Sequence, residues 1–95
     1  AMLGNNIGQR LDERDRLMMG QSFQSALERA PDNSSSSWRN PNTGNSGHTT
    51  PTRTVVASNG TPCREFTQNV MIGGKSQQAY GTACRMADGS WQIQR

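Results

Sequence analysis

Residues 62–86, PCREFTQNVMIGGKSQQAYGTACRM, contain two stretches of β-forming sequence on either side of Gly73-Gly74. Glycines at both central positions favour a two-residue hairpin turn, because they readily adopt the positive φ angles that this turn requires. We therefore predict antiparallel strands over residues 62–72 and 75–86. In the register that such a turn imposes, residues at equal distances from the turn lie directly opposite one another.

This register places the two cysteines, Cys63 and Cys84, opposite one another. Counting outward from the turn assigns them to a non-hydrogen-bonded pair, where Cα atoms lie about 4.5 Å apart and a disulfide can form. We predict a disulfide between them; the alternative is two buried free thiols. The bridge would close a loop of roughly twenty residues and contribute about 3 kcal/mol to stability. It would also indicate an oxidising compartment such as the periplasm or cell surface.

The same register divides the side chains of the two strands between the two faces of a sheet. Phe66 lies opposite Gly81, where an aromatic ring can cover a bare glycine. The face that contains Phe66 carries the larger apolar groups, and the other face is mostly polar. The first face holds Arg64, Phe66, Val70, Ile72, Ala79, Gly81 and Ala83; the second holds Cys63, Glu65, Thr67, Asn69, Gln78, Tyr80, Thr82 and Cys84.

Three further strands are expected, one beginning at Trp38 and two covering about residues 48–57 and 90–94. Polar and glycine residues over 41–47 predict a turn between the first two, and Asn59-Gly60 predicts a hairpin before the next. Pro51 lacks the N–H that a central strand needs, so it indicates an edge position or a bulge.

The connection before the last strand decides where Trp91 and Ile93 lie. A three-residue loop over residues 87–89, with Gly89 in the left-handed conformation, places them on the Phe66 face. A two-residue Asp88-Gly89 turn would instead put Trp91 beside the disulfide. We predict the three-residue loop, because it gathers the large apolar groups under one helix.

Residues 12–30 predict that helix. Asp12 is a suitable N-cap with Asp15 three residues later, and Pro31 ends the helix after its last turn. Apolar residues recur at helical spacing and form one stripe that can cover a sheet: Leu11, Met18, Met19, Phe23, Ala26, Leu27 and Ala30. The elements together predict an α+β domain, with one N-terminal helix packed on a four- or five-stranded antiparallel sheet.

The composition excludes several classes of function. The chain has 95 residues, of which 31% are hydrophobic, and no run approaches the roughly 20 apolar residues of a membrane-spanning helix. A single histidine, His48, and the absence of a nucleophile with a matching base leave no catalytic constellation. We therefore expect a non-enzyme without a cofactor or metal site. The net charge of +3 is weak evidence for a nucleic-acid partner, and none is expected.

Arg53, Arg64 and Arg85 are the candidate site residues. The predicted register puts Arg64 and Arg85 diagonally on one face, and Arg53 could join them from the neighbouring strand. Such a patch could bind carboxylate or phosphate groups with bidentate hydrogen bonds. The alternative is that the arginines cover the edge of the helix and pair with acidic residues, namely Glu28, Glu65 or Asp88.

The chain resembles, over about residues 3–94, the C-terminal domain of the seventeen-kilodalton rickettsial-type surface antigens, a family of glycine-zipper outer-membrane lipoproteins. The resemblance rests on a series of ordered motifs. They are Leu11-Asp12-Glu13, Trp38-Arg39-Asn40-Pro41, Cys63-Arg64-Glu65-Phe66, Ile72-Gly73-Gly74, Tyr80-Gly81-Thr82-Ala83-Cys84-Arg85 and Asp88-Gly89-Ser90-Trp91.

The resemblance implies a division of the chain at residue 10. Ala1-Met2 is typical of a cloning remnant, and residues 3–8 look like the tail of the family's glycine-zipper segment. Residues 11–95 would form the surface-antigen domain. Membrane attachment would come from a lipid anchor outside this sequence.

The resemblance also implies a location in the bacterial outer membrane, either facing the periplasm or exposed at the surface. The expected role is a non-enzymatic structural or interaction domain, whose partner is an envelope protein or a cell-wall or lipopolysaccharide component. The alternative is a small periplasmic inhibitor or ligand-binding module, which would use the arginine patch to bind anionic envelope components.

Overall fold

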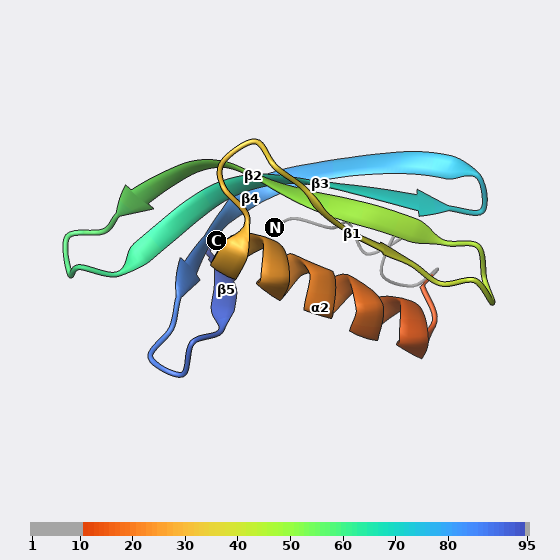
Figure 1. Cartoon of the computed structure of the whole chain (residues 1–95), viewed down its shortest axis with the longest axis horizontal. Helices are drawn as coiled ribbons and strands as arrows, with labels where there is room; N and C mark the ends of the chain where they lie inside the picture. Colours follow the sequence, from red (N-terminus) through yellow and green to blue (C-terminus); the bar gives the residue numbers. More distant parts are fainter. Residues whose placement is uncertain (1–10, 95) are drawn as a thin grey trace.

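The computed structural model describes residues 11–94, and its five strands form one antiparallel sheet in the order β1-β2-β3-β4-β5. The single helix of the described residues lies against one face of this curved sheet (Figure 1). The predicted α+β fold is thus confirmed, with five strands. The part of the prediction that concerns residues 1–10 lies outside the described residues. The elements are α2 (Glu13–Arg29), β1 (Ser36–Arg39), β2 (Ser46–Val56), β3 (Pro62–Ile72), β4 (Lys75–Arg85) and β5 (Trp91–Gln94).

The helix α2 begins with a capping box. The Asp15 N–H donates to Asp12 Oδ1 at 2.7 Å, and the Asp12 N–H donates to Asp15 Oδ2 at 3.1 Å. These two bonds satisfy N–H groups that have no acceptor within the first turn of a helix. The helix ends at Arg29, before Pro31, so the predicted range of 12–30 corresponds to the helix plus its two caps.

The β3–β4 hairpin has the predicted register. Gly73 and Gly74 adopt φ angles of 56° and 81° in the turn, and Cys63 lies directly opposite Cys84. The two cysteines form a disulfide, with a Cα–Cα distance of 4.0 Å. The predicted bridge is therefore confirmed.

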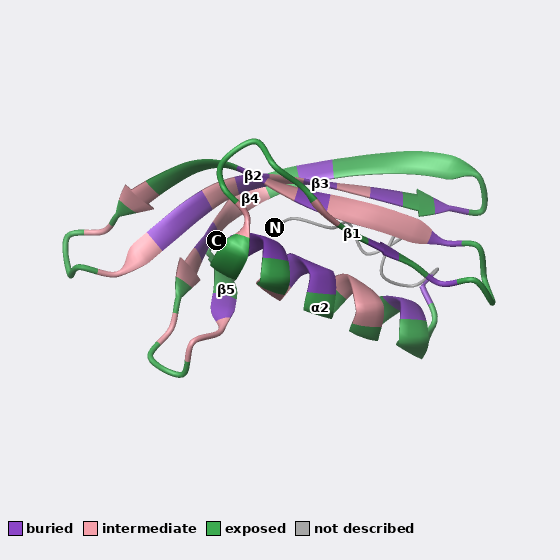
Figure 2. Cartoon of the chain, in the orientation of Figure 1, coloured by how far each residue is buried: buried purple, intermediate pink, exposed green. Residues whose placement is uncertain are grey.

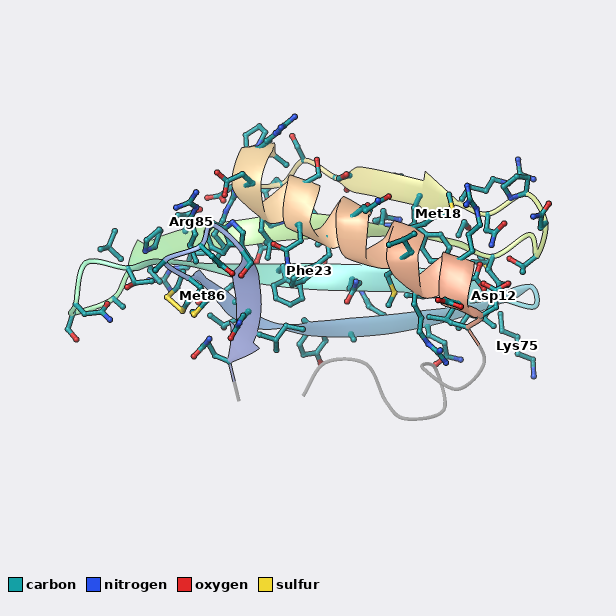
Figure 3. The ribbon with its side chains drawn as sticks, turned by 90° about the horizontal axis from the view of Figure 1, so that it is seen from below. Asp12, Met18, Phe23, Lys75, Arg85 and Met86 are labelled. Carbon is teal, nitrogen blue, oxygen red and sulfur yellow. A yellow bond between two sulfur atoms is a disulfide. The ribbon has the colours of Figure 1, made fainter. Side chains whose placement is uncertain are left out.

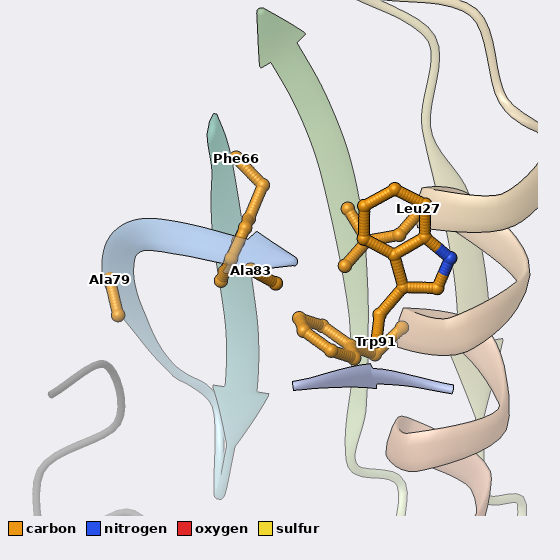
Figure 4. Close-up of a cluster of buried hydrophobic side chains, with 6 residues drawn as sticks. Leu27, Phe66, Ala79, Ala83 and Trp91 are labelled. Carbon is orange, nitrogen blue, oxygen red and sulfur yellow. The ribbon is translucent and has the colours of Figure 1, made fainter. Parts of the chain in front are cut away.

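The core lies between α2 and the sheet, in two clusters. Buried residues line the side of the helix that faces the sheet (Figure 2), and Phe23 points toward the sheet in the view from the helix side (Figure 3). The rings of Phe23 and Phe66 pack edge to face, with their centroids 5.1 Å apart. The first cluster contains Phe23, Leu27, Phe66, Ala79, Ala83 and Trp91 (Figure 4); the second contains Leu11, Trp38, Val70 and Ile72, with Met18 and Met19 packed against it.

The loop before β5 is the predicted three-residue loop. The Met86 N–H donates to the Ser90 carbonyl at 2.7 Å, and Gly89 has a φ angle of 90°. Trp91 therefore lies opposite Arg85 on the Phe66 face and is buried in the first cluster. Ile93 lies on the same face but remains 40% exposed.

The strand β2 begins two residues earlier than predicted, because Gly47 belongs to the strand and not to the preceding turn. Gly47 pairs with Trp38 on one side and with Val70 on the other. A Cβ atom at Gly47 would lie 2.7 Å from the indole nitrogen of Trp38 and 2.6 Å from the Asn69 carbonyl oxygen. The glycine that suggested a turn is required for the close packing of Trp38.

Candidate functional site

The structure does not bring the three candidate arginines together. In the pairing of β2 with β3, Pro51 lies opposite Phe66 but Arg53 lies opposite Glu65, because Thr52 is an extra residue at a bulge. Without the bulge, Arg53 would face Arg64. A shift of one residue moves a side chain to the other face of a sheet, so the expectation that Arg53 joins Arg64 and Arg85 is wrong.

Arg64 is a structural residue, with a relative exposure of 7%. Its guanidinium donates to the Leu27 carbonyl at the end of α2 at 2.8 Å and to the Asp32 carboxylate at 2.8 Å. Its Nε donates to Thr54 Oγ1 at 3.0 Å. The hydrogen bonds from Arg64 and Thr54 hold the pKa of Asp32 below its usual value. The donors of Arg64 are therefore occupied within the domain.

Arg85 and Arg53 also have acidic partners. Arg85 donates to Glu28 at 2.9 Å, and Glu28 accepts a second hydrogen bond of 2.9 Å from the Trp91 indole. The hydrogen bonds from Arg85 and Trp91 lower the pKa of Glu28. Arg53 lies 3.8 Å from Glu65 in an exposed pair. The arrangement therefore matches the alternative given in the sequence analysis, in which the arginines pair with acidic residues. The partner of Arg64 is Asp32, which was not among the acidic residues named there.

A buried carboxylate that sequence reasoning missed lies at the start of the helix. Asp15 has a relative exposure of 0%, and Asn45 donates to its Oδ2 at 2.8 Å. Its Oδ1 accepts from Asn40 and Thr43, each at 2.9 Å. Burial raises the pKa of Asp15, but the hydrogen bonds from Asn45, Thr43, Asp12 and Asn40 outweigh it, so the pKa lies below its usual value.

The same network extends to the far hairpin, because the Gly73 N–H donates to Asn45 Oδ1 at 3.2 Å. Asp15 therefore joins the helix, the β1–β2 loop and the β3–β4 turn. The sequence feature that could have indicated this network is the high density of asparagines over residues 40–45, which the sequence analysis interpreted only as a turn.

The face of the sheet opposite α2 carries polar side chains, and no helix of the described residues covers it (Figure 1). We call this surface the open face. Tyr80 stands out on it with a relative exposure of 72%. Cross-strand pairing arranges the side chains of the open face in rows that run across the strands. One row contains Ser37, His48, Asn69 and Gln78; the next rows contain Arg39, Ser46, Met71 and Ser76, and Thr50, Thr67 and Tyr80; a further row contains Arg53, Glu65 and Thr82.

Two shallow hollows lie on the open face. The first, of about 390 Å³, is lined by side chains that include Arg39, His48 and Asn69. The Asn69 amide nitrogen and His48 Nε2 lie 3.1 Å apart in a hydrogen bond. The second hollow, of about 370 Å³, is lined by residues that include Thr67 and Tyr80. These side chains can donate and accept hydrogen bonds, and Tyr80 adds an accessible aromatic surface.

The described residues offer neither a metal centre nor a membrane-spanning helix. Within residues 11–94, no three His, Cys, Asp or Glu side chains are grouped so that they could hold a metal ion. The helix of this part of the chain is too short and too polar to cross a bilayer.

Fold and surface together define a small disulfide-bonded α+β domain that covers one face of its sheet and leaves the other open. The family model described as 17 kDa outer membrane surface antigen matches residues 25–92. The chain belongs to this family, and the predicted family membership is confirmed. The family name indicates a location in the bacterial cell envelope.

Several rickettsial proteins are similar to this chain. The 17 kDa surface antigen of Rickettsia bellii is 53% identical over 89 residues, which are 94% of this chain and 56% of that protein. The 17 kDa surface antigen of Rickettsia conorii is 53% identical over 83 residues, 87% of this chain and 52% of that protein. That of Rickettsia prowazekii is 52% identical over 82 residues, with shares of 86% and 52%. The chain thus spans about half the length of these relatives. No solved structure is a significant match.

Proposed function

We propose that this chain is a non-enzymatic interaction domain of an outer-membrane lipoprotein, and that its open face contacts another envelope component. Membership of the surface-antigen family supports the envelope location. The Rickettsia bellii relative extends beyond the region that aligns with this chain, and the proposed lipid anchor would lie in a segment that corresponds to that extra region. Incorporation of labelled palmitate into the full-length protein tests the anchor; a full-length protein that takes up no label would contradict it.

The observation that carries the proposed role is the difference between the two faces of the sheet. One face packs against α2 through the two core clusters and Arg64. The other face presents hydroxyl, amide and imidazole groups around an exposed tyrosine. Tyrosine is enriched in protein recognition surfaces, because its ring is large and rigid and its hydroxyl can form hydrogen bonds.

The alternative role, binding of anionic envelope components by an arginine patch, has less support. Arg64 is buried and bonded to the helix, and Arg53 is on the other face of the sheet. The three side chains therefore cannot bind one anion together.

The test is site-specific photo-crosslinking in cells that express the full-length protein. A photoreactive amino acid replaces Tyr80 on the open face or, as a matched control, Gln21 on the exposed side of α2. We expect cross-links to an envelope component from position 80 and fewer from position 21. Equal cross-linking from both positions, or none from position 80, would contradict the role of the open face.

A further inference from the structure

We propose that the open face binds a glycan strand built of uncharged N-acetylated sugars, as in the glycan backbone of the cell wall. This inference rests on the proposed function and names the partner of the same surface. Three properties of the open face carry it: an exposed aromatic ring, a high density of neutral hydrogen-bonding groups, and little uncompensated charge.

Tyr80 supplies the aromatic ring. It is 72% exposed, and Thr67 lies beside it across the strand pair. The apolar C–H face of a sugar ring packs against an aromatic ring, while the phenol hydroxyl remains available for hydrogen bonds. The Tyr80 ring lies outside both core clusters, so it contributes less to the stability of this fold than the buried aromatic rings do.

The row next to that of Tyr80 supplies the neutral hydrogen-bonding groups. It places His48, Asn69 and Gln78 side by side on β2, β3 and β4. Amide side chains donate and accept at the same time, as sugar hydroxyls and N-acetyl groups do, so one row can satisfy both kinds of group. The hydrogen bond between Asn69 and His48 fixes the orientation of these two side chains before any ligand binds.

The charge of the open face favours an uncharged glycan over lipopolysaccharide. Arg53 is paired with Glu65 on this face. Arg39 is the other basic residue in the rows defined above. Binding of a densely phosphorylated saccharide calls for several basic side chains that can reach the phosphates together. The arginines that could have formed such a cluster, Arg64 and Arg85, lie on the covered face.

The open face is also long enough to bind an extended ligand. The two hollows lie at different points along β3 and β4, with Tyr80 lining one and Ser76 the other. The distance from Ser76 to Thr82 along a strand is about 20 Å. A linear oligosaccharide of several rings can therefore contact both hollows at once, whereas a single sugar cannot.

The experiment is a titration of the isotope-labelled domain, followed by NMR. Three probes are compared: uncharged glycan strands made of N-acetylglucosamine oligomers, stem peptides released from the cell wall by an amidase, and lipopolysaccharide. We expect saturable shifts with the glycan strands at amides of residues 67–71 and 76–82, and none with the stem peptides. Tyr80→Ala should weaken binding about tenfold, whereas the matched control Gln21→Ala should leave it unchanged.

The outcomes separate the two proposals. Absence of glycan binding, together with cross-links from position 80 to a protein, overturns the glycan inference and leaves the interaction role intact. Preferential binding of lipopolysaccharide or of stem peptides overturns the inference as well. Absence of any envelope ligand at the open face overturns both. Amide spectra of Tyr80→Ala establish that the variant is folded, so a loss of binding is due to the missing ring.

Discussion

Asn45, in the loop between β1 and β2, donates a 2.8 Å hydrogen bond to the buried carboxylate of Asp15 in the first turn of α2. Asn40 and Thr43 donate to the same carboxylate. No salt bridge involving Asp15 is among those of the described residues. These partners are neutral hydrogen-bond donors, and loss of the carboxylate would leave the buried amides of Asn40 and Asn45 without this acceptor.

Asp15→Ala should therefore lower the free energy of unfolding by about 3 kcal/mol. The substitution removes the acceptor of three side chains and one half of the capping box. Urea unfolding followed by circular dichroism measures the effect. Glu13→Ala is a control in the same turn, because Glu13 is exposed. A loss from Asp15→Ala no larger than that from Glu13→Ala would show that the network contributes little.

The stability of the domain should fall in acid. The pKa of Asp15 is lower in the folded protein than in the unfolded chain, so its contribution is complete above the usual pKa of an aspartate, about 4. As the pH falls through the lower, folded pKa, this contribution is lost. Glu28, Asp32 and Asp88, whose pKa values are also lowered, act in the same direction.

Urea midpoints at pH 7 and pH 3 test this dependence. Asp15→Asn cannot titrate at this position, so the difference between the two midpoints should be smaller for the variant than for the natural chain. An equal difference in both proteins would assign the acid sensitivity to the other carboxylates.

Arg64 and Arg53 should respond very differently to substitution. Arg64→Ala removes hydrogen bonds to the end of α2 and to Asp32, and should cost about 2 kcal/mol. Arg53→Ala removes only an exposed ion pair at 3.8 Å and should change stability by less than about 0.5 kcal/mol. Thermal unfolding of both variants makes the comparison. Similar losses would mean that the two side chains are equivalent, against the structure.

The disulfide should stabilise the domain chiefly through the unfolded state. Its sequence separation is 21 residues, and cross-links of this span contribute about 3 kcal/mol. The double variant Cys63→Ser, Cys84→Ser should lose this amount, and reduction of the natural chain should have the same effect. If reduction leaves the urea midpoint unchanged, the stabilisation comes from the packed sheet and not from the bridge.

Gln24 should protect the outer edge of β5. Its side-chain amide donates to the Trp91 carbonyl and accepts from the Trp91 N–H, both at 2.8 Å, as a neighbouring strand would. Gln24→Ala should therefore speed hydrogen exchange at the Trp91 amide and cost about 1 kcal/mol. Gln21→Ala, on the exposed side of the same helix, is the matched control. Unchanged exchange at Trp91 would contradict the role of Gln24.

The β3–β4 hairpin shows how far local sequence determines this fold. Two glycines at the turn fix the register, and the register alone then determines the disulfide partners and the face of every side chain on both strands. The cap at Asp12 and the stop at Pro31 bound the helix for equally local reasons. These features depend on neighbours in the chain or directly across one turn, so they can be predicted without the rest of the structure.

The remaining features depend on contacts between distant segments. Pro51 predicts an edge position or a bulge, and a bulge is present at Thr52, but only the pairing of β2 with β3 shows that Arg53 consequently lies on the opposite face. Asp15 is buried and accepts several hydrogen bonds because the β1–β2 loop, about thirty residues later in the chain, packs against the start of the helix. The sequence by itself determined the elements, the hairpin register and the disulfide, because short-range turn geometry and capping act within a few residues. Tertiary structure alone decided which polar groups are buried, because that outcome depends on how the helix and the loops pack against the completed sheet.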